Sequence, residues 1–184
     1  MVQIRDAETV AKCYPHQLSG GMRQRVLLAI AIACKPSLVI ADEPTTALDT
    51  IVQAQILKLV RELKDKLEVS FLLISHDIEV IASLCDRAYV MYAGKIVEGA
   101  DIKSLFNHPK HHYTQGLLAV AKAMHYGSNV VTIEGTVPDL VNPPQGCRFH
   151  PRCLHTDSRC KKEPVLERNG DTHEFACWRP IEYG

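Results

Sequence analysis

Two adjacent carboxylates and one histidine occupy positions that suit phosphoryl-transfer chemistry. Asp42 and Glu43 follow the apolar run 38–41, which predicts a short buried strand of a parallel sheet. A second apolar run, 69–75, ends at His76, and neighbouring parallel strands end at the same edge of a sheet. One carboxylate there can hold the hydration shell of Mg²⁺, and its neighbour can orient a water molecule toward a phosphoryl group. Adjacent acids are also common as surface charge and single histidines are often structural, so the prediction depends on this shared edge.

Ser19, Gly20 and Gly21 stand just before an expected helix, 22–34. Glycines let a ligand approach the backbone closely, and the first N–H groups of a helix have no partner within it. The three residues can therefore bind a phosphate group. The alternative interpretation is a serine that caps the helix after a turn, and this string alone leaves both open.

Four of the seven cysteines lie near the C-terminus: Cys147, Cys153, Cys160 and Cys177. Their spacing is not the C-x-x-C of common zinc sites, but four thiolates form a complete ligand set for a [4Fe–4S] cluster or a tetrahedral zinc ion. Reduced cysteines without a ligand are the alternative. Three nearby histidines could replace a thiolate on zinc: His150, His155 and His173.

Both candidate sites are expected on an α/β framework. Besides the two strands, the sequence predicts helices at 22–34, 50–67, 77–85 and 114–124, and a hairpin of 87–92 with 95–98. Strands that alternate with helices predict a parallel sheet with flanking helices. From Gly127 onward, Gly, Pro, Asn and Cys replace the periodic patterns. We therefore expect one domain at 1–126 and an irregular, Cys-rich extension at 127–184.

Composition excludes several classes of protein. The 184 residues carry 21 basic and 21 acidic side chains, so no net charge attracts nucleic acid or an anionic membrane surface. The longest apolar run, 26–34, is shorter than the roughly 18 residues that span a bilayer, and the first residues lack the pattern of an export signal. The sequence thus predicts a cytoplasmic chain without a nucleic-acid partner.

The motifs together resemble those of ABC-type ATPases. In order, LSGGM, LVIADE, TALD and the Ser75-His76 step resemble the signature, Walker B, D-loop and switch-histidine motifs. The longer strings QLSGGMRQRV, DEPTTALD and LLISHD look like the branch that imports peptides and nickel. VPDLVNPPQGCRFHPRC resembles the C-terminal extension of peptide-importer ATPases, some of which bind a [4Fe–4S] cluster through four such cysteines. Residues 107–114 resemble the segment before this extension, which we expect to be a solvated linker.

This resemblance implies a role for each matching residue. Asp42 would hold Mg²⁺ through water, and Glu43 would be the general base that activates the attacking water. His76 would contact the γ-phosphate of ATP, and Asp49 would lie at the interface of an ATPase dimer. The residues that would contact the γ-phosphate of ATP bound to a partner subunit are Ser19, Gly20 and Gly21.

The sequence lacks one motif of this family, the loop G-x-x-x-x-G-K-[ST], whose N–H groups and lysine hold the phosphates of the nucleotide. The family places that loop before the point where this chain begins. The implied fold is therefore an incomplete ABC-type P-loop NTPase domain, followed by the Cys-rich extension. We expect the chain alone neither to bind ATP tightly nor to hydrolyse it, and to leave a sheet face uncovered.

The predicted function is that of the ATP-hydrolysing subunit of an ABC transporter that imports peptides or a related solute. ATP and Mg²⁺ are the implied cofactors. The implied partners are a second ATPase subunit, membrane permease subunits and, indirectly, a solute-binding protein, which places the chain on the inner face of the cell membrane. The alternatives are a non-transport ABC ATPase and a catalytically silent fragment that binds metal or other subunits.

Overall fold

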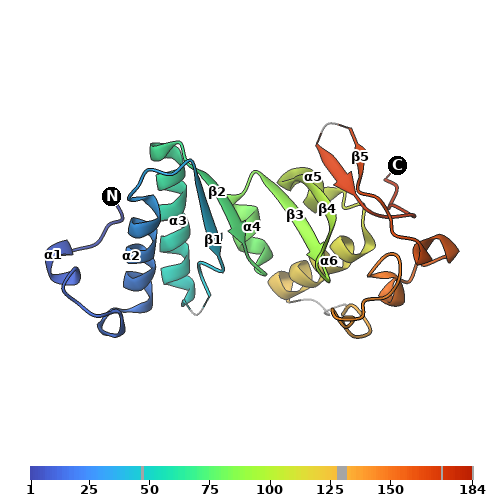
Figure 1. The fold of residues 1–184 in the computed structure, drawn as a ribbon, viewed down its shortest axis with the longest axis horizontal. Coiled ribbons are helices and arrows are strands. Elements are labelled where there is room, and N and C mark those ends of the chain that lie inside the picture. Colours follow the sequence, from blue (N-terminus) through green and yellow to red (C-terminus); the bar gives the residue numbers. More distant parts are fainter. Residues whose placement is uncertain (47, 128–131, 171, 184) are drawn as a thin grey trace. The chain divides into compact units, whose positions relative to one another are not determined.

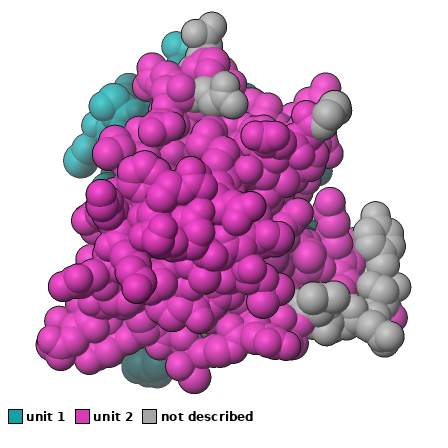
Figure 2. All heavy atoms as spheres, turned by 90° about the vertical axis from the view of Figure 1, so that its right-hand side faces the viewer, with its two compact units in different colours: residues 1–84 teal, residues 85–184 magenta. Residues whose placement is uncertain are grey.

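The computed structural model describes residues 1–46, 48–127, 132–170 and 172–183. The chain forms two compact units, residues 1–84 and 85–184, whose elements are labelled in Figure 1 and whose surfaces are coloured separately in Figure 2. The compact units divide after Leu84, and a strand of the extension pairs with the hairpin that follows Leu84. The predicted domain boundary near Gly127 stays a prediction. Within the described ranges, none of the helices is long and apolar enough to cross a membrane.

Unit 1 contains a two-stranded parallel sheet beside helices (Figure 1). β1 (Leu38–Asp42) and β2 (Ser70–Ile74) pair in register, from Leu38 opposite Ser70 to Asp42 opposite Ile74. The other elements are α1 (Ala7–Val10), η1 (Pro15–Gln17), α2 (Gly20–Ile32), α3 (Thr50–Leu67) and α4 (Ile78–Leu84). The predicted strands and the helices expected from the periodic patterns are confirmed in type and order, although α2 begins and ends slightly earlier than expected.

One face of α3 forms the centre of the core of unit 1. Ile56, Leu59, Val60 and Leu63 recur at helical spacing and are almost fully buried. Burying each such side chain contributes roughly 1.5–3 kcal/mol to folding. Side chains packed with them come from α2, β1 and the residue just before β2: Leu28, Ile32, Val39 and Val69.

The outer face of the β1–β2 sheet is exposed. Leu38, Ile40, Leu72 and Ile74 alternate with the inward-facing residues, and each is between 48% and 63% exposed. Within the described part of unit 1, no other element covers these side chains, which agrees with the expectation of an uncovered sheet face. The effect on solubility stays a prediction.

Unit 2 is built on a four-stranded antiparallel sheet with the strand order β3-β4-β6-β5. The hairpin strands are β3 (Arg87–Tyr92) and β4 (Lys95–Asp101), and the extension supplies β5 (Glu167–Asn169) and β6 (His173–Phe175). Helices α5 (Ile102–Asn107) and α6 (His112–Tyr126) follow the hairpin, and the short helices η2 (His150–Arg152) and η3 (Ser158–Lys161) carry part of the Cys-rich segment. The extension is largely irregular, as expected, but two of its segments, each three residues long, complete this sheet, which the sequence did not predict.

An aromatic cluster joins the extension to the rest of unit 2. The ring of Phe149, in the extension, lies 5.2 Å from Tyr92 of β3 and 5.4 Å from Tyr113 of α6, measured between ring centroids. Tyr92 and Tyr113 are themselves 4.6 Å apart. Such aromatic pairs each contribute about 0.5–1.5 kcal/mol beyond the burial of their area. The Cys-rich segment is thus packed onto the same core as the hairpin.

Candidate functional site

The carboxyl ends of β1 and β2 frame a cavity of about 210 Å³ in unit 1, which we call the Glu43 pocket. Glu43 directly follows β1, and its N–H donates to the carbonyl of Ile74 at the end of β2, which extends the pairing of the two strands by one step. The pocket is lined by Glu43, Thr45, Thr46, Leu48, Gln53, Ser75, His76 and Asp77. The two strands therefore bring Glu43 and His76 to one edge, as the two apolar runs predicted.

Both carboxylate oxygens of Glu43 are hydrogen-bonded. Nδ1 of His76 lies 2.8 Å from Oε1, the backbone N–H of His76 donates to the same oxygen at 3.2 Å, and the Thr46 hydroxyl donates to Oε2 at 2.8 Å. Glu43 also adopts a φ of 46°, in the left-handed region that a residue with a Cβ rarely occupies. The surrounding hydrogen bonds hold the carboxylate in this conformation, and strained residues of this kind concentrate at functional sites.

The pairing shifts both ionisation equilibria. The hydrogen bond from His76, and next that from Thr46, holds the pKa of Glu43 below its ordinary value, while the hydrogen bond to Glu43 raises the pKa of His76. The Glu43 side chain is 37% exposed and the His76 side chain is 79% exposed. Water therefore screens their attraction, and the pair adds little to stability. Its chemical effect is to keep Glu43 ionised and to favour a proton on His76.

Asp42 and Ser19 have different surroundings. Asp42 is the exposed last residue of β1 and lies beside Glu43 in sequence, but it does not line the Glu43 pocket. The Ser19 hydroxyl accepts from the N–H of Met22 at 3.3 Å, so it caps α2. The capping interpretation of Ser19 is therefore confirmed, and contacts of these residues with Mg²⁺ or phosphate stay predictions.

The two signature glycines lie against the start of α3. A Cβ on Gly20 would come within 3.1 Å of the Leu48 side chain, and a Cβ on Gly21 within 2.7 Å of Val52. Asp49 caps α3, because its carboxylate accepts from the N–H groups of Ile51 at 3.1 Å and Val52 at 2.9 Å. The glycines thus permit close packing of α2 on α3, and Asp49 has a structural role that the motif alone did not indicate.

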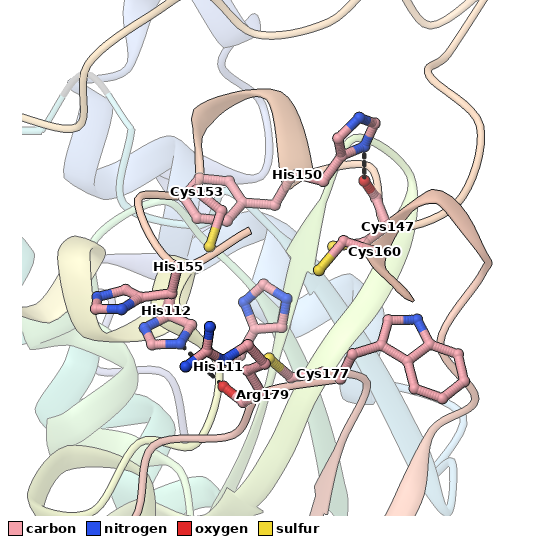
Figure 3. Close-up of a pocket in the computed structure, with 11 residues that line it drawn as sticks. His111, His112, Cys147, His150, Cys153, His155, Cys160, Cys177 and Arg179 are labelled. Atoms are coloured by element: carbon pink, nitrogen blue, oxygen red, sulfur yellow. Dashed lines mark hydrogen bonds between the residues drawn. The ribbon is translucent and has the colours of Figure 1, made fainter. Parts of the chain in front are cut away.

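A second candidate site, which we call the cysteine cavity, lies in unit 2 (Figure 3). It is lined by Cys147, Cys153, Cys160, Cys177, His111, His112, His150, His155, Phe149, Trp178 and Arg179. The extension therefore brings all four predicted cysteines together, although up to 30 positions separate the first from the last in sequence. Cys160 is buried and the other three are partly buried.

Burial shapes the chemistry of these thiols. It raises the pKa of Cys147 and Cys153, and it raises that of Cys177 to about 11, with a smaller contribution from the neighbouring cysteines. Thiols must lose their protons to bind a metal, so binding would release protons. Among the described residues, no three His, Cys, Asp or Glu side chains are arranged to hold a single metal ion. This finding supports neither a zinc ion nor a [4Fe–4S] cluster in the cavity, and both stay predictions.

A tight turn sets the positions of two of the cysteines. The N–H of Cys147 donates to the carbonyl of Cys160 at 3.0 Å. Gly146 has a φ of 81°, and a Cβ there would lie 2.4 Å from the same carbonyl oxygen. Only glycine fits this position, because the two backbone segments would collide with any side chain.

The segment 107–114 is not a solvated linker. His111 is 1% exposed, and its Nδ1 accepts from the N–H of Tyr113 at 3.0 Å as the N-cap of α6. Burial lowers the pKa of His111 to about 4. His112 lies within hydrogen-bonding distance of the Arg179 carbonyl, at 2.9 Å, and stacks on His155 at 4.2 Å. The sequence pattern missed the contacts of His112 because they join residues more than 40 positions apart.

Two family models match this chain. Residues 1–46 match the ABC transporter family, and residues 97–160 match the C-terminal region of the oligopeptide/dipeptide transporter family. The first match contains Ser19 and Glu43, and the second contains three of the four cavity cysteines. The chain is therefore similar to the ABC transporter family over its first 46 residues and to the oligopeptide/dipeptide transporter family over residues 97–160.

Its curated relatives are peptide transport proteins. It is 45% identical over 182 residues to the oligopeptide transport ATP-binding protein OppD of Salmonella typhimurium, which is 98% of this chain and 54% of that protein. It is 47% identical over 180 residues to the dipeptide transport ATP-binding protein DppD of Bacillus subtilis, covering 97% of this chain and 54% of that protein. The chain thus spans about half the length of these relatives.

A solved structure also aligns with part of the chain. It is the dimeric ATP-binding cassette MJ0796 in a post-hydrolysis state with ADP and Pi. The alignment covers 55% of this chain and 42% of that one, with 30% identity and a TM-score of 0.48.

Proposed function

We propose that this chain is part of the ATP-hydrolysing subunit of an ABC transporter that imports peptides or a related solute. The observation that carries the proposal is the Glu43 pocket, where a carboxylate and a histidine 2.8 Å apart end two parallel strands. The match to the ABC transporter family model and the names of the relatives support the transport role. The subunit would work on the cytoplasmic side of the membrane, with permease subunits and a second ATPase subunit as partners and a solute-binding protein acting indirectly.

Two residues of the Glu43 pocket and the neighbouring Asp42 have separate tasks in this reaction. Glu43 accepts a proton from the attacking water through an oxygen that His76 or Thr46 releases. His76, whose raised pKa favours the protonated form, donates toward the γ-phosphate. Asp42, at the end of β1, holds the hydration shell of Mg²⁺. Bound Mg²⁺ neutralises charge on the phosphates of ATP.

The start of α2 serves the ATP of the second subunit. Helix α2 begins at Gly20, so its first N–H groups include those of Gly20 and Gly21. These groups can donate to a γ-phosphate. Asp49, which caps α3 beside these glycines, lies at the dimer interface. The chain alone, which carries no G-x-x-x-x-G-K-[ST] loop, does not turn over ATP.

The test asks whether this chain restores the activity of a defective partner subunit. The chain is mixed with an intact oligopeptide-type ATP-binding subunit whose own signature serine has been replaced, so that its dimers lack a working signature. We expect this chain to restore ATP hydrolysis by supplying α2. Ser19→Asp should abolish the gain, because aspartate caps the helix as well as serine does but repels the phosphate. Ser19→Asn, a neutral cap, is the matched control and should retain most of it.

Two results would contradict this proposal. One is the absence of any gain in hydrolysis with the wild-type chain, and the other is a gain that Ser19→Asp leaves unchanged. Separately, ATP turnover by the purified chain alone that Glu43→Gln abolishes would refute its inactivity in isolation. The relatives described above are all transport proteins, and no observation favours the non-transport or the silent alternative.

We further propose that the cysteine cavity holds a [4Fe–4S] cluster through Cys147, Cys153, Cys160 and Cys177. The donor set fits, because four thiols line one cavity. A cluster binds each thiolate to a different iron atom, so the thiols surround a group larger than one ion.

Anaerobic reconstitution with iron and sulfide tests the cluster. We expect near-stoichiometric iron and sulfide and a broad absorption in the visible blue, both lost in Cys153→Ser. Cys34→Ser is the matched control, because Cys34 is exposed and lies in unit 1. One zinc ion per chain and no bound sulfide would refute the proposal.

A further inference from the structure

His111 presents an unpaired polar atom inside the cysteine cavity. The side chain is 1% exposed, and its Nε2 is buried without a hydrogen-bond partner. Figure 3 shows the imidazole among the cysteine side chains that line the cavity. A buried polar atom without a partner is costly in a folded protein, and each instance calls for a physical explanation.

The other ring nitrogen determines what this atom can do. Nδ1 lies 3.0 Å from the backbone N of Tyr113, which carries a hydrogen, so Nδ1 must accept and cannot itself be protonated. A neutral imidazole carries its one proton on the remaining nitrogen. The atom that lacks a partner is therefore an N–H donor at Nε2, not an acceptor.

The described surroundings of the ring offer its Nε2–H no acceptor. One side of the ring faces Phe149, 5.8 Å away between ring centroids and itself buried, which offers no hydrogen-bond acceptor. The other cavity histidines differ from His111. Nδ1 of His150 and Nε2 of His112 lie 2.9 Å from the carbonyls of Cys147 and Arg179, to which they can only donate. Nδ1 of His112 is also buried without a partner, but in a neutral ring that donates from Nε2 it is an acceptor, and His155 is exposed. Among the described histidines of this lining, His111 is thus the one with a buried N–H donor that has no partner.

The position of the His111 ring is fixed before any ligand arrives. Nδ1 is held by the start of α6, and the backbone N–H of His111 donates to the buried carboxylate of Glu98 at 2.9 Å. A donor held in this way loses little conformational freedom when it forms a bond, so the bond is stronger than that of a mobile surface side chain.

We propose that the Nε2–H of His111 donates a hydrogen bond to a sulfur atom of the iron–sulfur group bound by the four cysteines. This inference rests on the proposed cluster. Hydrogen bonds to the sulfurs of a cluster stabilise its more negatively charged, reduced form. His111 is therefore a positioning residue that raises the reduction potential of the bound group and slows its loss.

Two substitutions separate this role from the capping of α6. Asparagine places a carbonyl oxygen where Nδ1 lies and is a good N-cap, but its side chain is too short to reach the position of Nε2. Glutamine reaches the position of Nε2 with an amide N–H donor but does not cap. His111→Asn thus removes the donor and keeps the cap, and His111→Gln does the reverse.

The experiment compares the full chain and these variants after anaerobic reconstitution. Redox titration, followed by visible absorption, gives the potential, and iron release to a chelator gives the stability of the cluster. We expect His111→Asn to have a more negative potential and faster iron release, at an unchanged thermal midpoint of the metal-free chain. We expect His111→Gln to retain the wild-type potential with a lower midpoint. His108→Asn, outside the cavity, is the control and should change neither.

A further readout needs no cluster. Nitrogen-15 NMR of the metal-free chain should show the His111 proton on Nε2, and a proton on Nδ1 overturns the inference. A wild-type chain that binds no iron and sulfide refutes the proposed cluster, and the inference falls with it. A wild-type cluster whose potential and iron release are unchanged in His111→Asn overturns the inference alone.

Discussion

Glu98 gives the most demanding test of how unit 2 is held together. Its carboxylate is 0% exposed, yet it accepts from the backbone N–H of Lys110 at 2.6 Å and of His111 at 2.9 Å, and Nε2 of His173 lies 2.7 Å away. These partners belong to the segment before α6 and to β6, whereas Glu98 lies on β4. One buried side chain therefore connects three segments of the unit.

The size of the effect follows from the partners that each variant leaves unsatisfied. Glu98→Ala removes both acceptor oxygens and leaves two backbone N–H groups and the His173 ring without a partner. Each buried group without a partner costs about 1–3 kcal/mol, so for three groups we expect a loss of roughly 3–9 kcal/mol. Glu98→Gln keeps one oxygen but turns an amide N–H toward one of the donors, so we expect about 1–3 kcal/mol.

The intrinsic fluorescence of the chain reports on this unit selectively. The single tryptophan of the sequence, Trp178, lies in unit 2 and donates to the Lys162 carbonyl at 2.9 Å. Urea denaturation followed by tryptophan fluorescence therefore measures the unfolding of unit 2. Glu163→Gln is the matched control, because Glu163 is 62% exposed and pairs with Lys95 at the surface. We expect it to leave the midpoint unchanged within error.

The order of the variants is the decisive result. A loss in Glu98→Ala below about 1 kcal/mol would show that the carboxylate does not hold these segments together. Equal losses in Glu98→Gln and Glu98→Ala would show that packing of the side chain, rather than its acceptor oxygens, accounts for the effect.

Three further predictions concern the two sites. The pKa of His76, followed by NMR, should lie above its ordinary value of about 6.5 and should fall in Glu43→Gln. Because the pKa of His76 is raised and that of Glu43 is lowered, the pair stabilises the fold most between about pH 4.5 and 6.5. This contribution should fade as the pH rises through the raised pKa of His76 or falls through the lowered pKa of Glu43. Asp49→Ala should reduce the stability of unit 1 by about 0.5–2 kcal/mol through the lost cap of α3, measured by hydrogen exchange of the first helical turn, whereas Asp49→Asn should retain most of it. Gly146→Ala should destabilise unit 2 by more than about 1 kcal/mol and abolish iron binding, because its Cβ would collide with the Cys160 carbonyl, and normal iron content in this variant would contradict the described turn.

Local patterns were sufficient to predict unit 1. The apolar run 38–41 and the helical spacing of Ile56, Leu59 and Leu63 determine which faces are buried, and neither requires distant parts of the chain. The pairing of Glu43 with His76 follows from these elements, because two parallel strands in register must end together. The hydrogen bond from Thr46 was missed, although its position three residues after Glu43 at a tight turn was a usable signal.

Unit 2 could not be predicted in the same way, because its contacts are distant in sequence. β4 and β6 pair through residues such as Glu98 and Phe175, and the two strands of the extension are only three residues long. Strands this short carry no periodic signal, and their pairing depends on packing rather than on local preference. The sequence also did not predict the burial of Glu98, because a charged residue in a hairpin is ordinarily exposed. The partners that bury it lie far away in sequence or on another element.

The same long-range contacts connect the predictions for unit 2. Glu98 holds the backbone of His111, and the His111 ring caps α6 and directs its remaining N–H into the cysteine cavity. Loss of the Glu98 carboxylate should therefore weaken the donor as well as the fold. If both proposals for the cysteine cavity hold, a reconstituted Glu98→Gln chain that remains folded should show a potential more negative than the wild type but less so than His111→Asn. A wild-type potential in Glu98→Gln, together with a shifted one in His111→Asn, would show that the cap of α6 alone positions the imidazole.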